Sequence, residues 1–248
     1  MKEVRGSLRH LRREVAPPYW PILKKEYTWT VKPSPGPHPV RRSIPLGIIV
    51  RDILKYARTM REARRILSEG HIKVDGKVRK DYKFPVGLMD VLEVTTTGEA
   101  YRIVPHPQKF LTLLPIPKEE ASFKLCRIEG KSNVKGGAFQ LHLHDGRNLL
   151  VGAEEATKYT TYDVIKIRIP EQEIVEHVKF REGVLAVIID GRNVGKAGKV
   201  KSIVRIFKKA NALVTLEDNE GRETRTLLKY VFAVGSDKPL LEVIPRGS

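Results

Sequence analysis

The chain has 248 residues, of which 46 are Lys or Arg and 29 are Asp or Glu, and its formal net charge of +17 at pH 7 indicates a polyanionic partner, most commonly a nucleic acid. A composition of 41% hydrophobic and 30% charged residues excludes a disordered or fibrous protein, and the single cysteine excludes a disulfide framework and a Cys-x-x-Cys metal site. The longest apolar runs, residues 44–50 and 184–189, are too short to span a bilayer, and no secretory leader opens the sequence, so we expect a soluble, cytoplasmic protein.

Residues 1–42 are predicted to form a basic, Pro-rich extension without a core of its own. The prolines at positions 17, 18 and 21 and throughout 33–39 prevent a continuous helix or a central strand. Aromatic side chains stand among the cations of this extension, at Tyr19, Trp20, Tyr27 and Trp29. Two interpretations stay open: an arm that becomes ordered on RNA through stacking and phosphate contacts, or a strap that Trp20 and Trp29 pack onto the body of the protein.

Residues 43–105 are predicted to begin with two helices. Apolar residues at helical spacing indicate a first helix over 46–57. A second helix begins at Thr59, where Glu62 completes a capping box, and it ends at Gly70.

Cations gather on the second helix and on the segment that follows it. Arg61, Arg64 and Arg65 share one exposed helix face. Alternating residues around Asp75-Gly76 predict a β-hairpin over 71–79, and if the hairpin folds back beside the helix, the two form one positive surface. Because guanidinium groups match phosphate oxygens, we predict RNA contact here, with an ordinary solvated basic face as the alternative. The predicted contacts in this half of the chain are Arg41, Arg42, Arg58, Arg61, Arg64, Arg65, Lys73, Lys77, Arg79, Lys80 and Lys83.

Residues 59–78 also carry a resemblance to a known module. They are similar to the helix and hairpin of the S-four-type RNA-binding domain, which recurs in ribosomal proteins, pseudouridine synthases and some tRNA synthetases. The resemblance implies an RNA-binding module, without specifying the task for which the module is used.

The second half of the chain is predicted to be mostly β. Apolar and polar residues alternate over 139–144 and 165–169, and Asp145-Gly146 predicts a turn. Short strands separated by glycines over 176–235 suit a small barrel.

A glycine-rich basic turn lies between two of these strands. Residues 183–200 resemble the KOW motif of ribosomal proteins and transcription elongation factors. A Walker loop is excluded, because only three residues separate Gly191 from Gly195 and because Ala197 follows the lysine. The functional interpretation is a phosphate cradle and the alternative is a tight turn of purely structural importance. The predicted RNA contacts in this turn are Arg192, Asn193, Lys196 and Lys199.

Metal and catalytic sites are not predicted. His142 and His144 point the same way beside Asp145 and could begin a zinc site, but further ligands with fitting spacing are missing. Cys126 lies among apolar residues and is predicted to be a small buried hydrophobe. No common catalytic motif occurs, so we expect no enzyme activity, no cofactor, no metal and no small-molecule substrate.

Taken in order, these segments resemble the archaeal and eukaryotic small-subunit ribosomal proteins of the S-four-e family. The resemblance extends over almost the whole chain, and it is carried by residues 10–13, 35–38, 44–46, 75–79, 82–90, 124–126, 144–147, 170–172, 177–180, 183–200, 231–235 and 245–247. Eukaryotic members continue beyond the position that corresponds to Ser248, so the chain is expected to be archaeal.

The resemblance implies a multi-domain α+β fold. The expected parts are the basic extension (1–42), an S-four-type RNA-binding domain (43–105), a central family-specific β domain (106–175), a C-terminal KOW β-barrel (176–235) and a tail (236–248). The implied function is that of a structural constituent of the small ribosomal subunit, bound to its RNA and to neighbouring ribosomal proteins and not to a membrane. An RNA-modifying enzyme anchored by the S-four-type module and a KOW-containing transcription elongation factor are the alternatives.

Overall fold

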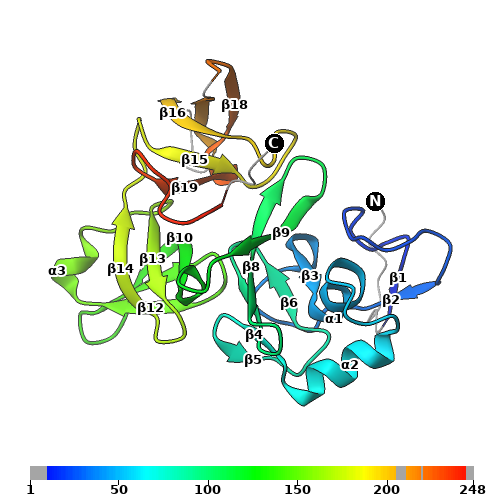
Figure 1. Cartoon of the computed structure of the whole chain (residues 1–248). Helices are drawn as coiled ribbons and strands as arrows, with labels where there is room; N and C mark the ends of the chain where they lie inside the picture. The colour runs from blue at the N-terminus through cyan, green and yellow to red at the C-terminus, as the bar shows by residue number, and fades with distance from the viewer. Residues whose placement is uncertain (1–9, 205–210, 219, 244–248) are drawn as a thin grey trace. The chain divides into compact units, whose positions relative to one another are not determined.

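The structure, a computed structural model, describes residues 10–204, 211–218 and 220–243 (Figure 1). The chain divides into two compact units: unit 1 comprises Met1–Ile72 and Val78–Gly87, and unit 2 comprises Lys73–Lys77 and Leu88–Ser248. No helix in the described residues is long and apolar enough to cross a bilayer.

Unit 1 holds most of the helical residues and several short strands. Its two small antiparallel sheets pair β1 with β2 and β3 with β6. The elements are β1 (Leu11–Arg12), β2 (Trp29–Thr30), the 3-10 turn η1 (Val40–Arg42), β3 (Ser43–Pro45), α1 (Leu46–Ile48), the π-helical turn η2 (Ile49–Ile53), α2 (Met60–Glu69) and β6 (Pro85–Gly87).

Helix α2 is confirmed at both ends. The hydroxyl of Thr59 accepts a hydrogen bond from the Glu62 amide at 3.2 Å, and the Glu62 carboxylate accepts one from the Thr59 amide at 3.4 Å. Gly70 ends the helix with a φ of 86°, in the left-handed region that glycine adopts without strain. Ala63 and Leu67 are fully buried, so the opposite face is free to carry charge.

The first predicted helix is shorter than expected. The α-helical pattern covers only Leu46–Ile48, and wider π-helical turns replace it over Ile49–Ile53: the Leu54 amide donates to the Ile49 carbonyl, five residues back. Lys55 then has a positive φ of 58°, which a helix cannot continue through. Tyr56, within the predicted span of 46–57, is therefore outside the helix and 38% exposed.

The N-terminal extension is tied to unit 1 by one of its two tryptophans. Trp20 is 2% exposed, and its indole nitrogen donates to the Ser43 carbonyl at 2.8 Å. His38 is buried against Gly87, where a Cβ atom would lie 2.3 Å from the imidazole ring. Trp29 is 54% exposed. The strap interpretation therefore holds for Trp20 and fails for Trp29.

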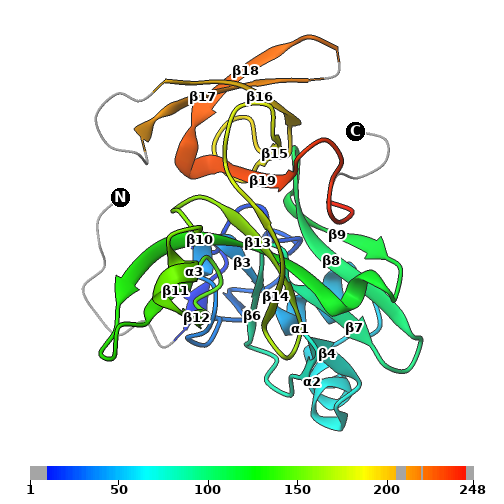
Figure 2. The ribbon, with the colours of Figure 1, turned by 90° about the vertical axis from the view of Figure 1, so that its left-hand side faces the viewer.

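Unit 2 is built almost entirely of strands in three five-stranded sheets. Their orders are β5-β4-β7-β8-β9, β12-β11-β10-β13-β14 and β18-β17-β16-β15-β19, and Figure 2 shows the strands of the last sheet in yellow and orange. The hairpin strands β4 and β5 cross the boundary between the units. The elements are β4 (Ile72–Val74), β5 (Lys77–Val78), β7 (Val91–Val94), β8 (Glu99–His106), β9 (Phe110–Ile116), η3 (Glu120–Ser122), β10 (Phe123–Asn133), β11 (Phe139–Leu143), β12 (Asn148–Val151), α3 (Ala153–Ala156), β13 (Val164–Arg168), β14 (Glu173–Val178), β15 (Leu185–Ile188), β16 (Ala197–Val204), β17 (Leu213–Glu217), β18 (Glu223–Leu227), η5 (Leu228–Tyr230) and β19 (Val231–Gly235).

The alternation of apolar and polar residues over 139–144 and 165–169 corresponds to a buried and an exposed face of strands β11 and β13. Leu141 and Leu143 on β11 and Ile165 and Ile167 on β13 all point into one apolar core. The last sheet has a second core of its own, formed by residues of β15, β16, β17 and β19. The mostly β prediction for the second half of the chain is therefore confirmed.

Candidate nucleic-acid interface

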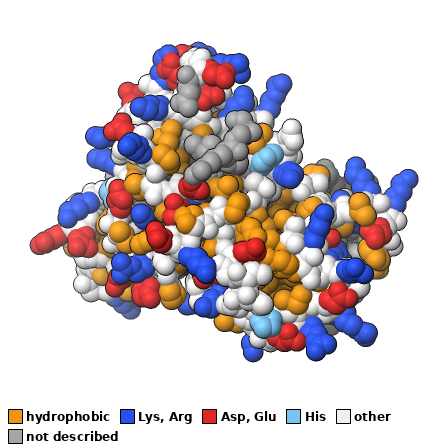
Figure 3. Space-filling view, in the orientation of Figure 1, with side chains coloured by type: hydrophobic (Ala, Val, Ile, Leu, Met, Phe, Trp, Pro, Cys, Tyr) orange, Lys and Arg blue, Asp and Glu red, His pale blue; other side chains and the backbone are white. Residues whose placement is uncertain are grey.

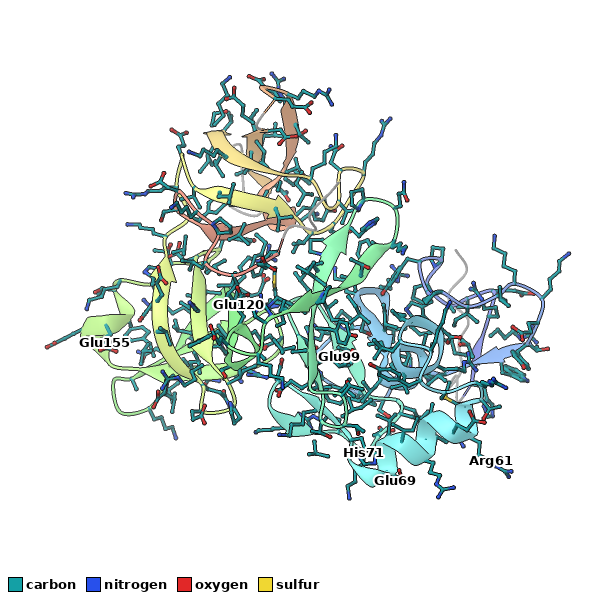
Figure 4. All side chains as sticks on the ribbon, viewed as in Figure 1. Arg61, Glu69, His71, Glu99, Glu120 and Glu155 are labelled. Carbon is teal, nitrogen blue, oxygen red and sulfur yellow. The ribbon has the colours of Figure 1, made fainter. Side chains whose placement is uncertain are left out.

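The exposed face of α2 carries the arginines that the sequence predicted. Arg61, Arg64 and Arg65 are all exposed. Figure 4 shows Arg61 directed away from the ribbon, and in Figure 3 blue Lys and Arg side chains project from the surface over α2. Arg65 pairs with Glu69 at 3.0 Å, and its guanidinium lowers the pKa of that carboxyl. This exposed pair contributes little to stability and leaves the arginine available to another anion.

The chain that leaves the hairpin returns to the C-terminal end of α2. A Cβ on Gly70 would lie 3.3 Å from a Val78 methyl and 4.0 Å from Lys80. Arg79 and Lys80 therefore belong to the same unit as the helix, as do Arg41 and Arg42 in the exposed turn η1 and Lys83. Lys73 and Lys77 are assigned to unit 2, on the hairpin itself.

Arg79, like Lys73 and Asn193 among the predicted contacts, is half-buried. Its guanidinium lies over the Phe84 ring, 4.5 Å from the ring centre. We attribute to it a packing role in addition to its charge.

A groove of about 570 Å³ opens in unit 1 at the start of α2. Arg58, Arg64 and Lys83, three of the predicted contacts, line it. Sequence reasoning did not select the further basic residues at its wall, Lys32 and Arg51, or the rings of His10 and Tyr82. His10, Lys32 and Arg51 are separated in sequence from the predicted contacts, whereas Tyr82 directly precedes Lys83 and could have been found from that position.

Tyr82 is held in the groove from two directions. The Gly47 amide donates to the Tyr82 carbonyl at 2.8 Å, and the two segments approach closely, because a Cβ on Gly47 would lie 3.1 Å from that oxygen. The Arg64 guanidinium lies 4.0 Å from the centre of the Tyr82 ring and donates to the phenol oxygen at 2.7 Å. One predicted arginine is therefore positioned by an aromatic ring and not only by the helix.

Trp29 stands on β2 at another part of the groove. Its neighbour in the β1–β2 register is Arg12, whose guanidinium lies 5.8 Å from the centre of the indole. The His10 ring lies 5.4 Å away at an interplanar angle of 54°. The indole thus combines an exposed aromatic surface with nearby positive charge.

The glycine turn of unit 2 differs from the predicted phosphate cradle. Arg192, Lys196 and Lys199 are exposed and Asn193 is half-buried. Three backbone amides of the turn are occupied within the chain: those of Gly191, Gly195 and Lys196 donate to the Asp190 carboxylate and to the Ile188 and Asn193 carbonyls, respectively. These three amides are therefore not free to bind a phosphate.

A buried cluster of charges in unit 2 was not predicted. Lys124 has no exposed side-chain surface, and its ammonium lies 2.8, 2.6 and 2.9 Å from Asp75, Asp90 and Asp145. Burial alone would lower the pKa of Lys124, but the three carboxylates raise it well above its usual value. Arg147 adds contacts to Asp75 and Asp145. The cluster joins the hairpin turn at 75, the start of β7, strand β10 and the turn at 145, and we assign it to stability.

The same region contains the one set of described residues with spacing suited to a metal ion, Cys126, His144 and Asp145. The donors do not favour a cation. Burial, followed by the nearby Asp145, raises the pKa of the Cys126 thiol well above its usual value, so the thiol stays protonated. Lys124 already neutralises Asp145. His142, the other candidate, pairs with Ser132 and Asn148 and is not part of this set.

Family models match three consecutive parts of the chain. They are the RS4NT domain over residues 5–41, the S4 domain over 48–92 and Ribosomal family S4e over 97–174. The small ribosomal subunit proteins eS4 of Staphylothermus marinus and Aeropyrum pernix are each 53% identical to the chain, over 98% of its length and 98% of theirs.

A solved structure is also similar to this chain. The crystal structure of the 30S ribosomal protein S4e from Thermoplasma acidophilum aligns with a TM-score of 0.67 and 36% identity, covering 79% of this chain and 96% of the other. With similarity of this extent in sequence and in structure, the chain belongs to ribosomal family S4e.

Proposed function

We propose that the chain is a structural constituent of the small ribosomal subunit, which binds and stabilises the subunit's RNA during assembly and translation. The observation that carries this proposal is the exposed arginine face of α2. Arg61, Arg64 and Arg65 are held in register by a capped helix, in a family whose curated members bear the name small ribosomal subunit protein. A rigid array of guanidinium groups matches phosphates along a folded RNA backbone without any chemical reaction.

The proposal extends to the parts of the chain. The S-four-type domain over 43–105 would make the main RNA contact, the extension over 1–42 would add to it, and the β domain over 106–175 would supply a scaffold. The five-stranded sheet from β15 to β19 supports a KOW barrel over 176–235, followed by the tail 236–248. Residues 1–9, 205–210, 219 and 244–248 lie outside the described residues.

The family and the basic charge of the chain also support the partners that we propose. They are the small-subunit ribosomal RNA and neighbouring small-subunit proteins, in the cytoplasm, with no small-molecule substrate and no catalysis. The charge that supports RNA binding is the +17 of the whole chain. The ribosomal family supports a structural role over the RNA-modifying enzyme and the elongation factor.

Charge reversal on α2 tests the proposal. With Arg61, Arg64 and Arg65 all changed to Glu, we expect incorporation into small subunits to fall at least tenfold, because each site changes from attracting a phosphate to repelling it. The measurement is co-sedimentation of the tagged chain with small subunits in a lysate gradient, with circular dichroism to verify the fold.

The matched control reverses three exposed lysines of unit 2, Lys135, Lys158 and Lys179, which changes the net charge by the same amount. We expect this control to incorporate far better than the α2 variant. Equal incorporation of the α2 variant and the wild type would remove α2 from the proposed RNA interface.

A further inference from the structure

We propose that the groove at the start of α2 binds a single unpaired nucleotide of the RNA, with its base stacked on Trp29 and its phosphates on the surrounding cations. This inference deepens the proposed function and rests on it. It specifies the form of RNA that the groove binds, namely a base turned out of the helical stack. The exposed face of α2 alone could bind any phosphate backbone.

The first support is the number of aromatic rings that one groove displays. Tyr27, Trp29 and Tyr82 all line it, and Tyr27 and Trp29 are 58% and 54% exposed. Large aromatic rings are normally buried, because their apolar surface is costly to leave in water. Trp20, nine residues before Trp29, is 2% exposed and shows that the same extension buries an indole where packing requires it. The exposed rings form a platform of the kind on which nucleic-acid bases stack.

The second support is charge complementarity. The groove is lined by the basic side chains of Lys32, Arg51, Arg58, Arg64 and Lys83 and by the imidazole of His10, and none of its lining residues is acidic. Arg51 is paired with Asp52 at 3.0 Å, so the argument from charge rests on Arg58, Arg64 and Lys83. An apolar peptide would leave these charges without partners, whereas a nucleotide satisfies rings and cations together.

The third support is that the carboxylate of Glu62 already occupies the start of α2, where its negative charge repels a phosphate. The Glu62 carboxylate accepts from the Arg58 amide at 2.8 Å and from the Thr59 amide at 3.4 Å. A phosphate here would therefore meet the side chains of Arg58, Arg64 and Lys83 and not the helix N-terminus. Such contacts do not select a base, so we expect the site to read an exposed base by stacking and not by hydrogen-bonded sequence recognition.

The dimensions and shape of the site fit this occupant. A volume of about 570 Å³ is within the range of pockets that hold small organic ligands. In an A-form duplex the bases are stacked and their faces are inaccessible, so only a loop, bulge or end can place a base in the groove.

Tryptophan fluorescence of the full chain tests the inference directly. The chain has two tryptophans, and the emission present in the wild type but absent from Trp29→Phe belongs to Trp29. The probes are a hexamer of adenylates, a hexamer of abasic ribose phosphates with the same charge, and a blunt RNA duplex. We expect the adenylate hexamer to quench Trp29 and to bind about five- to 150-fold more tightly than the abasic hexamer, the range that stacking of one base supplies.

Substitutions then assign the effect to the groove. Trp29→Ala is expected to remove most of the preference for adenylates over the abasic hexamer, whereas Trp29→Phe retains most of it because a ring remains. Leu23→Ala is the matched control: Leu23 lies in the same extension and is 70% exposed, but it does not line the groove.

Two results would overturn the inference: equal affinity for the two hexamers, or Trp29 emission that the blunt duplex quenches as strongly as the adenylate hexamer does. Either result leaves the proposed function standing if the α2 charge reversal still prevents subunit incorporation. If that reversal has no effect, the proposed α2 interface fails on its own experiment.

Discussion

At the scale of one residue, Lys124 shows how a buried charge connects distant segments of unit 2. Its ammonium is fully buried within 3 Å of three carboxylates from distant parts of unit 2. An ion pair of this kind adds little net stability compared with apolar packing, but breaking it leaves charges buried without a partner.

Replacement of this lysine is therefore expected to be severe. Lys124→Met should lower the free energy of unfolding by about 3–5 kcal/mol, because three carboxylates lose their common partner. Urea unfolding followed by circular dichroism measures the change. Lys109→Met, at an exposed position, is the control and should change the stability by less than about 0.5 kcal/mol. A similar small change in both variants would contradict this role for Lys124.

The lowered pKa of Asp145, in the same cluster, predicts how the free energy of unfolding depends on pH. Burial alone would raise its pKa, but the charges of Lys124, His144 and Arg147 lower it below the usual 3.8. A carboxyl whose pKa is lower in the folded state stabilises the protein above its unfolded pKa, and that contribution is lost as the pH falls below about 4. Asp75, whose pKa burial raises, acts in the opposite direction.

The comparison of wild type with Asp145→Asn isolates this effect. Between about pH 6 and pH 3 the free energy of unfolding should fall more in the wild type than in the variant, because only the wild type must protonate Asp145. Urea midpoints across this range provide the measurement. Parallel pH profiles for the two proteins would show that Asp145 does not contribute.

At the scale of elements, the turn before β16 depends on close contact with a neighbouring segment. Gly195 has a φ of 83°, and a Cβ there would lie 2.6 Å from the backbone nitrogen of Pro107. Gly183 has a similar φ of 86° but has nothing within 4 Å of the same position. A side chain at Gly183 would therefore cost only backbone strain, whereas one at Gly195 would add a steric clash.

Alanine at each position tests this difference. Gly183→Ala is expected to cost about 1–2 kcal/mol, from the left-handed conformation alone. Gly195→Ala should cost about 1–3 kcal/mol more, because the added methyl group meets backbone that cannot rotate away. Chemical denaturation of the two variants gives the comparison, and equal losses would mean that the turn relaxes freely.

At the scale of the whole molecule, the net charge of +17 predicts how binding responds to salt. If about eight phosphates are neutralised, the logarithm of the affinity should fall with the logarithm of the salt concentration with a slope of roughly −6 to −7. Filter binding to a small-subunit RNA fragment between about 50 and 200 mM salt measures the slope. An affinity that does not change with salt would show that charge is not the driving force.

Much of the local structure could be predicted because its causes lie within a few residues. The Thr59–Glu62 box and Gly70 define α2, and Asp75-Gly76 defines the hairpin, with positive φ at both turn residues. The strap and the first helix were predicted less well. A positive φ at Lys55 and the burial of only one of two tryptophans depend on what the rest of the chain packs against them.

The sequence by itself determined the basic character of this protein, the caps of α2, the alternation of its strands and its resemblance to the S4e family. Each of these features depends on neighbouring residues or on the overall composition. The tertiary structure alone decided that Lys124 meets three aspartates, that the Gly195 amide of the glycine turn bonds to the Ile188 carbonyl, and that Trp29 and Tyr82 share one groove with Arg64. These features require segments far apart in the chain to meet, and local patterns carry no information about which distant segment will be the neighbour.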